Sequence, residues 1–172
     1  MTKTKKAPKT TERDEKYEAL QKIGRCAMSA IAEMVTALEC DYDRLEELRE
    51  ARDNEHGDMS ITADEAEELA ELEDAAGDCK SRDDAEQRIQ EDPLSLEFRS
   101  GWVTDKKEME PEEFKLLLTT GGPAVQIIGE LDRGEPSHVR LQAQDWFTPW
   151  TDYMDQDTAV LETYCRVFYF GD

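Results

Sequence analysis

The pattern of apolar and polar positions divides the chain into a helical first half and a β-rich second half. From Tyr17 onward, apolar side chains recur at spacings of three, four or seven residues, as they do on one face of a helix. A continuous helix from Tyr17 to about Asn54 would be roughly 57 Å long, more than a compact domain of this length covers. The pattern therefore predicts that a partner helix covers this stripe. Its positions are Leu20, Ile23, Ala27, Ile31, Met34, Leu38, Leu45 and Leu48.

Two more helices are predicted before residue 92. Thr62 and Glu65 have the spacing of a capping box, in which a hydroxyl and a carboxylate satisfy the first backbone amides of a helix. The helix that follows runs to about Asp78, and its small apolar residues favour packing against the first helix as an antiparallel hairpin. A short third helix is expected at 82–90.

Residues after Pro93 show the alternation and the turn residues that are typical of β-strands. Short connections between successive strands imply an antiparallel sheet, and a last helix from about Asp155 to Phe170, capped by Asp155 or Asp157, covers one of its faces. The predicted fold class is α+β, with an N-terminal acidic helical hairpin followed by a four-stranded antiparallel sheet and one C-terminal helix. The strands are predicted at 94–103, 113–119, 124–131 and 137–146.

Composition divides the chain into three segments: a disordered basic tail at 1–15, a helical hairpin arm at 16–91, and the sheet with its helix at 92–172. After Met1 the tail has no apolar side chain larger than Ala, and such a composition favours disorder. A solvated tail that partly neutralises the acidic body is favoured over a nuclear-import or nucleic-acid-binding signal.

The chain carries 42 Asp and Glu residues against 21 Lys and Arg residues, a net charge of −21. Between Asp41 and Asp92 there are 21 acidic and six basic residues, so the local net charge is −15. A field of this size favours a basic partner and opposes direct binding to nucleic acid or to an anionic membrane. No apolar run approaches the roughly 20 residues of a membrane span and no secretory signal is visible, so we expect a soluble, cytoplasmic protein.

The stretch 63–78 contains eight acidic residues and no basic residue. Residues three and four apart are neighbours on a helix, so Asp64, Glu68 and Glu71 are expected to form one row, and Glu67, Glu71 and Asp74 an adjoining one. Such rows can imitate the regular negative charge of a nucleic-acid backbone. An ordinary solvated helix face is the favoured alternative, because most charge runs are solvated. Against it, such faces usually include Lys, and like charges at these spacings destabilise a helix. The candidate partner-binding carboxylates are Asp64, Glu65, Glu67, Glu68, Glu71, Glu73, Asp74 and Asp78.

A second candidate surface consists of aromatic residues in the β-rich half, most of them in the motif QDWFTPW at 144–150. If these rings are exposed, they form a patch that a protein partner can bind. A small core beneath the last helix is the favoured alternative, because the sheet has little other bulk to bury. The residues are Trp102, Trp146, Phe147, Trp150 and Tyr153.

The sequence offers little for catalysis or metal binding. The four cysteines form no C-x-x-C pair and the two histidines have no companion at ligand spacing, so reduced cysteines and no metal are expected. The conceivable catalytic groups are Cys165 with His138, or Asp145 with Glu97 and Arg99, and neither set has the arrangement of a nucleophile and its base. We therefore expect neither a cofactor nor enzymatic activity.

Five stretches carry a resemblance to a known group of proteins. They are ECDYDRLEELRE at 39–50, DPLSLEFRSGW at 92–102, LLLTTGGPAVQIIGELD at 116–132, LQAQDWFTPWTDY at 141–153 and YCRVFYFGD at 164–172. These stretches resemble small uncharacterised proteins encoded by bacteriophages, prophages and plasmids. The resemblance implies an origin in a bacterial mobile element and an accessory task such as countering host defences.

Charge placement and this resemblance lead to one functional hypothesis: a mobile-element inhibitor whose acidic surface binds a basic, nucleic-acid-binding host protein, such as a CRISPR or restriction component. The alternative is a non-catalytic adaptor or structural module that oligomerises through the hairpin. The apolar stripe of the first helix exceeds what the second helix covers, so a homodimer is expected. The predicted self-association residues are Ile31, Met34, Leu38, Leu45 and Leu48.

Overall fold

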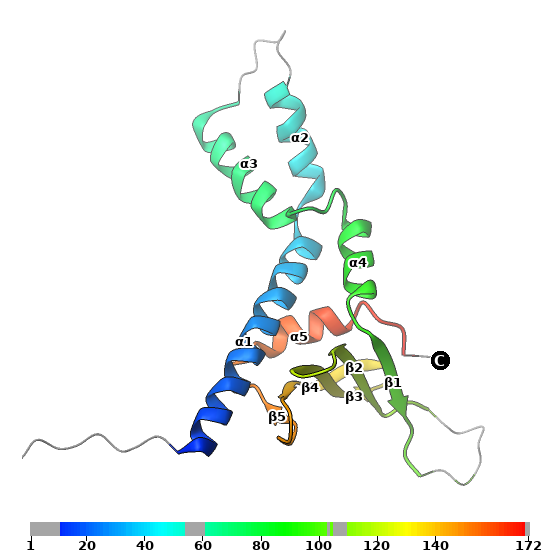
Figure 1. The fold of residues 1–172 in the computed structure, drawn as a ribbon. Helices are drawn as coiled ribbons and strands as arrows, with labels where there is room; N and C mark the ends of the chain where they lie inside the picture. Colours follow the sequence, from blue (N-terminus) through cyan, green and yellow to red (C-terminus); the bar gives the residue numbers. More distant parts are fainter. Residues whose placement is uncertain (1–10, 54–60, 103, 105–109, 171–172) are drawn as a thin grey trace, which may run out of the picture.

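The computed structural model describes residues 11–53, 61–102, 104 and 110–170. In these residues the chain forms five helices and a five-stranded antiparallel sheet, with four of the helices preceding the sheet (Figure 1). The predicted α+β class is confirmed. The helices are α1 (Glu12–Glu39), α2 (Tyr42–Asp53), α3 (Ala63–Ala76), α4 (Arg82–Glu91) and α5 (Thr158–Cys165). The strands are β1 (Ser95–Arg99), β2 (Glu113–Thr119), β3 (Ala124–Asp132), β4 (Glu135–Gln144) and β5 (Thr151–Asp152).

The five strands lie in the sheet in chain order, and each pairs with the next in antiparallel register. The first predicted strand is shorter than expected, and β4 begins and ends two residues before the predicted 137–146. Strand β5 was not predicted, because two residues carry no periodic signal. Gln21 of α1 holds the chain beside β5: its side-chain amide donates to the Asp152 carbonyl at 2.9 Å and accepts from the Met154 amide at 3.0 Å.

Helix α1 begins earlier than the sequence pattern suggested. Thr11 and Asp14 form a capping box in which each side chain satisfies the other residue's backbone N–H. The prediction of a disordered tail is therefore wrong for 11–15, and its remaining part lies outside the described residues. At the other end of the chain, Asp157 caps a helix of eight residues that is shorter than the predicted 155–170.

The apolar stripe from Tyr17 to about Asn54 does not form one continuous helix, because α1 ends at Glu39 with Cys40 as its C-cap. Cys40 has extended backbone angles (φ −60°, ψ 140°), and the Asp41 carboxylate accepts from the Arg44 amide at 3.0 Å at the start of α2. This new helix start separates the hairpin formed by α2 and α3 from α1, which packs on α4, α5 and the sheet (Figure 1).

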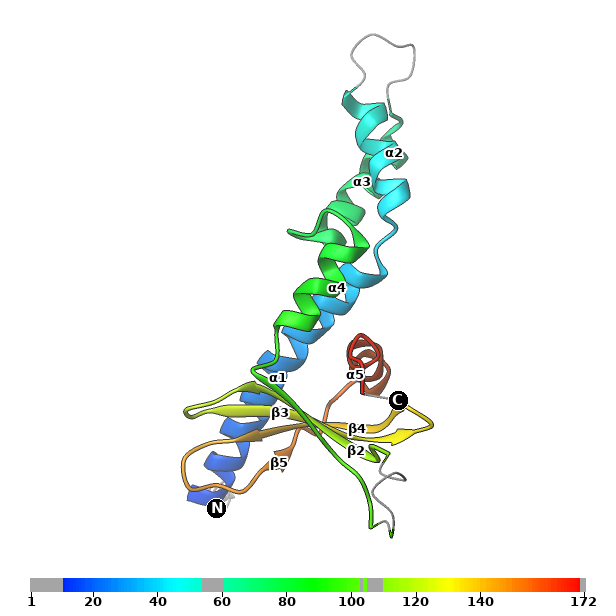
Figure 2. The same cartoon turned by 90° about the vertical axis from the view of Figure 1, so that its right-hand side faces the viewer.

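Two apolar cores result from this break. The larger core, which we call the body core, lies between one face of the sheet and helices α1, α4 and α5 (Figure 2). The smaller, the hairpin core, lies between α2 and α3 and consists of Leu45, Leu48, Leu69 and Ala76.

Both cores contain residues that were predicted to mediate self-association. Ile31, Met34 and Leu38 lie in the body core, Leu45 and Leu48 lie in the hairpin core, and none of the five is more than 5% exposed. The argument that this stripe needs a second copy to cover it is therefore wrong, because α3, α4, α5 and the sheet of the same chain cover it. Among the described residues, none of the helices is both long and apolar enough to cross a membrane.

Candidate protein-binding surface on the α2–α3 hairpin

The hairpin is positioned by local signals at both ends of α3. The predicted capping box of Thr62 and Glu65 is present, with the Glu65 carboxylate accepting from the Thr62 backbone N–H at 2.8 Å. Gly77 ends the helix at a positive φ of 54°, a conformation that glycine adopts without strain. Between these ends, Leu69 and Ala76 face α2 and leave the opposite side of α3 in solvent.

Arginines of α2 pair with three of the eight candidate carboxylates. Arg44 donates two hydrogen bonds to Glu68, at 3.1 and 2.9 Å, and lies 3.9 Å from Glu65. Arg49 and Arg52 both reach the same Glu73 oxygen, at 3.2 and 3.3 Å. We call this set of pairs the seam, because it runs between the two helices of the hairpin.

Two of these carboxylates, Glu68 and Glu65, have a lowered pKa. Hydrogen bonds from Arg44 hold the pKa of Glu68 below its ordinary value. The pKa of Glu65 is also lowered, first by the hydrogen bond from the Thr62 backbone N–H and then by the Thr62 hydroxyl. These carboxylates are already engaged within the chain, so they are poorly suited to a partner. Of the expected row of Asp64, Glu68 and Glu71, the Glu68 carboxylate is paired with Arg44, whereas Asp64 and Glu71 are exposed.

The other five carboxylates form a separate set on the solvent side of α3, which we call the outer row. Successive members are three or four residues apart, so they follow one face of the helix, and all are exposed. Within the described part of the chain, no ion pair or hydrogen bond engages their side chains. The outer row consists of Asp64, Glu67, Glu71 and Asp74 on α3 and Asp78 just beyond it.

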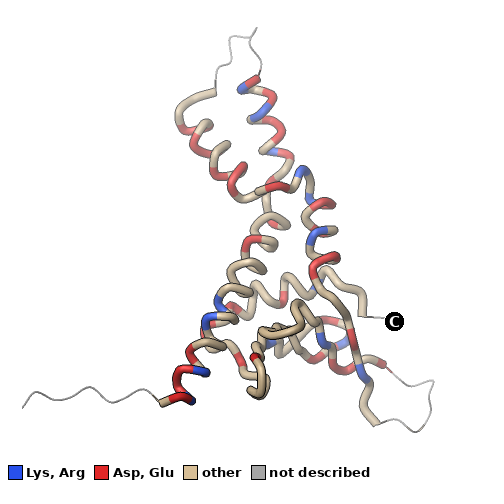
Figure 3. Tube along the Cα trace, viewed as in Figure 1, with Lys and Arg blue, Asp and Glu red and all other residues tan. Residues whose placement is uncertain are grey.

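The outer row has a charge spacing of the same order as a nucleic-acid strand. The four carboxylates from Asp64 to Asp74 span ten residue steps, about 15 Å of helix, or one charge about every 5 Å. A DNA strand carries one charge about every 3.4 Å along its axis. Acidic positions follow α3 along its whole length without a basic position, whereas α2 has both signs (Figure 3).

The aromatic candidates do not form one cluster. Tyr153 is buried in the body core and Trp150 is half-buried, whereas Trp102, Trp146 and Phe147 are exposed. The favoured prediction that these rings form a core is therefore wrong for the three exposed rings. Trp102 belongs to the connection between β1 and β2, far along the chain from the turn that carries the other two.

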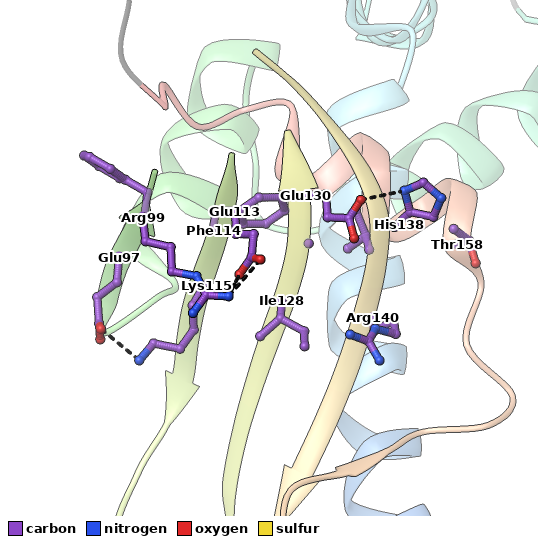
Figure 4. Close-up of a pocket in the computed structure, with 13 residues that line it drawn as sticks. Glu97, Arg99, Glu113, Phe114, Lys115, Ile128, Glu130, His138, Arg140 and Thr158 are labelled. Atoms are coloured by element: carbon purple, nitrogen blue, oxygen red, sulfur yellow. Dashed lines mark hydrogen bonds and ion pairs between the residues drawn. The ribbon is translucent and has the colours of Figure 1, made fainter. Parts of the chain in front are cut away.

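The uncovered face of the sheet contains a groove of about 840 Å³, shown in Figure 4. Cross-strand contacts between acidic and basic residues line it: Lys115 pairs with Glu97 at 2.8 Å, Arg99 pairs with Glu113 at 2.6 Å, and His138 lies 3.3 Å from Glu130. The Lys115 and Arg99 charges are each accompanied by an opposite charge, so this part of the groove presents no concentrated field to a charged ligand.

The conceivable catalytic groups are not brought together. Cys165 is buried in the body core, where burial raises the pKa of its thiol, while His138 pairs with Glu130 on the opposite face of the sheet. Glu97 and Arg99 pair with other residues rather than with Asp145. In the part of the chain that the structure describes, no group of His, Cys, Asp and Glu has the arrangement of a metal site.

The fold and this surface define an acidic α+β protein with a projecting helical hairpin. Comparisons with protein-family models, with curated proteins and with solved structures found no match to the chain.

Proposed function

We propose that this protein is an inhibitor that binds a basic, nucleic-acid-binding protein, with the outer row of α3 occupying the groove that normally holds nucleic acid. The observation that carries the proposal is the separation of the hairpin carboxylates into two sets. The seam carboxylates are paired with arginines of the same chain, whereas the outer row is exposed and has no basic partner among the described residues.

An energetic argument supports a binding role for this row. Like charges three and four residues apart each destabilise a helix by about 0.2–0.5 kcal/mol, and the row contains several such pairs. An ordinary solvated face relieves this repulsion with interspersed Lys, which α3 lacks. A groove that binds phosphates with Lys and Arg releases bound ions when it binds carboxylates in the same way.

The biological setting of the proposal comes from the resemblance of the sequence to mobile-element proteins. A bacterial host protein that handles nucleic acid, such as a component of a CRISPR or restriction system, is the partner that this setting favours. An oligomeric adaptor is not favoured, because the apolar stripe that suggested it is buried within one chain.

The test is capture of host proteins with two matched triple variants. The row variant carries Glu67→Lys, Glu71→Lys and Asp74→Lys. The control variant carries Glu15→Lys, Glu18→Lys and Asp132→Lys, three exposed acids outside the hairpin. Both variants raise the net charge by six, from −21 to −15, so any difference between them reports the position of the charge.

The parent protein and the control variant are expected to retain a nucleic-acid-binding host protein, and mixed-sequence duplex DNA is expected to displace that protein. The row variant, with its helical content intact by circular dichroism, is expected to lose it. Equal capture by both variants, or a captured protein that DNA does not displace, contradicts the proposal.

A further inference from the structure

A second surface lies on the turn between β4 and β5, where two large rings point into solvent. Trp146 is 68% exposed and Phe147 is 102% exposed, although the neighbouring Tyr153 is buried. The two ring centroids are 6.3 Å apart and the planes are inclined by 45°. The rings therefore form one continuous aromatic surface rather than two isolated side chains.

Hydrogen bonds within the turn fix the position of these rings. The Asp145 amide donates to the Thr148 hydroxyl at 2.9 Å, and the Thr148 amide donates to the Asp145 carbonyl at 2.9 Å. The Trp146 amide donates to the Asp145 carboxylate at 2.8 Å. Phe147 has a positive φ of 63°, which is uncommon for a bulky residue and directs its ring outward. Because the fold already holds both rings in place, a partner that binds them loses little free energy to the ordering of this turn.

Trp146 is also seated on the neighbouring turn between β2 and β3. A Cβ atom added to Gly122 would clash with the indole nitrogen of Trp146, so only glycine fits beneath the ring. Gly122 also has a positive φ of 98°. One edge of the indole is held by this backbone and the rest of the ring is open.

The charge around the rings determines which partner fits. Neither turn, at 119–123 or at 144–152, contains a Lys, Arg or His residue, and Asp145 lies directly beside Trp146. Aromatic faces are electron-rich and attract cations, and indole is the strongest of them. A chain of net charge −21 repels nucleic acid and anionic lipid, so stacked bases and membrane surfaces are disfavoured.

We propose that the Trp146–Phe147 pair binds an arginine side chain of a protein partner, with the guanidinium stacked on the rings and paired with the Asp145 carboxylate. Arginine fits better than lysine, because its planar, weakly hydrated guanidinium stacks on aromatic faces and pairs with a carboxylate at the same time. This site is separate from the outer row. Gln21, near the start of α1, holds β5, whereas the hairpin follows the opposite end of α1.

The experiment follows the indole N–H signals of ¹⁵N-labelled protein by NMR while a blocked Gly-Gly-Arg-Gly-Gly peptide is added. Matched peptides carry citrulline, lysine or leucine in place of arginine. The arginine peptide is expected to shift the Trp146 signal and to bind about two- to five-fold more tightly than the citrulline peptide, the range for an exposed cation–aromatic contact. Lysine is expected to fall between the two.

Three variants separate this site from general attraction to an acidic protein. Phe147→Asn removes the ring and keeps a residue that tolerates positive φ, and Asp145→Asn removes the charge and keeps the hydrogen-bond acceptor. Each is expected to remove most of the arginine preference. Trp102→Ala, at a ring that is 107% exposed but outside this turn, is expected to change nothing.

The row variant of α3 is expected to keep the arginine preference, so failure of this site and failure of the proposed function are distinguishable. Equal binding of the arginine and citrulline peptides, or leucine binding as tightly as arginine, overturns the proposal.

Discussion

Twenty-one described residues form the body core, from α1, α4, α5, the sheet and the segments beside them, whereas four form the hairpin core. The hairpin adds the Arg44–Glu68 pair and the contacts of Arg49 and Arg52 with Glu73. Tyr42 packs against both cores, and its hydroxyl donates to the Ala37 carbonyl at 2.9 Å across the break between α1 and α2.

This difference in core size predicts a difference in local stability between the hairpin and the body. Segments with few buried apolar contacts open at lower free energy than the rest of a protein. The hairpin that carries the outer row is therefore expected to be the less stable part, and its charged seam contributes a larger share of its stability. We expect the hairpin to open by itself and the unfolding of the body to unfold the whole molecule.

The largest expected effect comes from Leu141→Ala in the body. Leu141 is fully buried on β4, between β3 and β5, and a truncation of this kind costs about 2–5 kcal/mol because it leaves a cavity. Chemical denaturation is expected to show one lower midpoint for the sheet and the helices together. If the hairpin keeps its denaturation midpoint while the body loses stability, the hairpin does not need the folded body, and this expectation is contradicted.

Leu48→Ala tests the hairpin in the same way. Leu48 is only 1% exposed, but it belongs to the small core. Hydrogen exchange of the backbone amides of α2 and α3 is expected to accelerate, because the smaller core makes local opening of the hairpin easier. The amides of β3 are expected to keep their protection. A uniform loss of protection across the chain would show that the two cores unfold as one.

Arg44→Gln measures what the seam contributes. Both partners are partly exposed, so the loss in hairpin stability is expected to be small, and it should shrink as salt is added. Exchange of α3 amides at low and high salt gives this difference. Glu39→Gln, an exposed acid outside the seam, serves as the control.

The pH dependence of the hairpin is the smallest expected effect. The pKa of Glu68 is lower in the folded protein than its ordinary value of 4.5. Its contribution to stability is therefore present above the ordinary value and is lost as the pH falls through the folded pKa. Exchange measurements on the parent and on Glu68→Gln are expected to differ at neutral pH and to converge in acid. A difference that stays constant with pH excludes this role for Glu68.

Local signals in the sequence predicted the elements well, and signals that depend on a distant partner were missed. The capping box of Thr62 and Glu65 lies within four residues and was confirmed. The break at Cys40 was missed because the heptad spacing continues through it from Leu38 to Leu45, although Asp41 interrupts the apolar series and begins the next helix.

The candidate sites also depend on contacts between residues that are far apart in the sequence. Glu67 and Glu68 lie in one acidic run, but Glu68 is paired with Arg44 of α2, whereas Glu67 is exposed. The outward position of Trp146 depends on Gly122 from another turn, a contact that no local pattern encodes.

The most direct test of the account is the salt dependence of binding to the captured partner, measured for the parent, the row variant and the control variant. For the parent and the control variant, affinity is expected to fall about ten-fold or more between 50 and 200 mM salt, because several charges pair and release ions. The row variant is expected to bind weakly at both salt concentrations. Equal affinity and an equal salt slope for all three proteins would contradict the claim that the outer row is the binding surface.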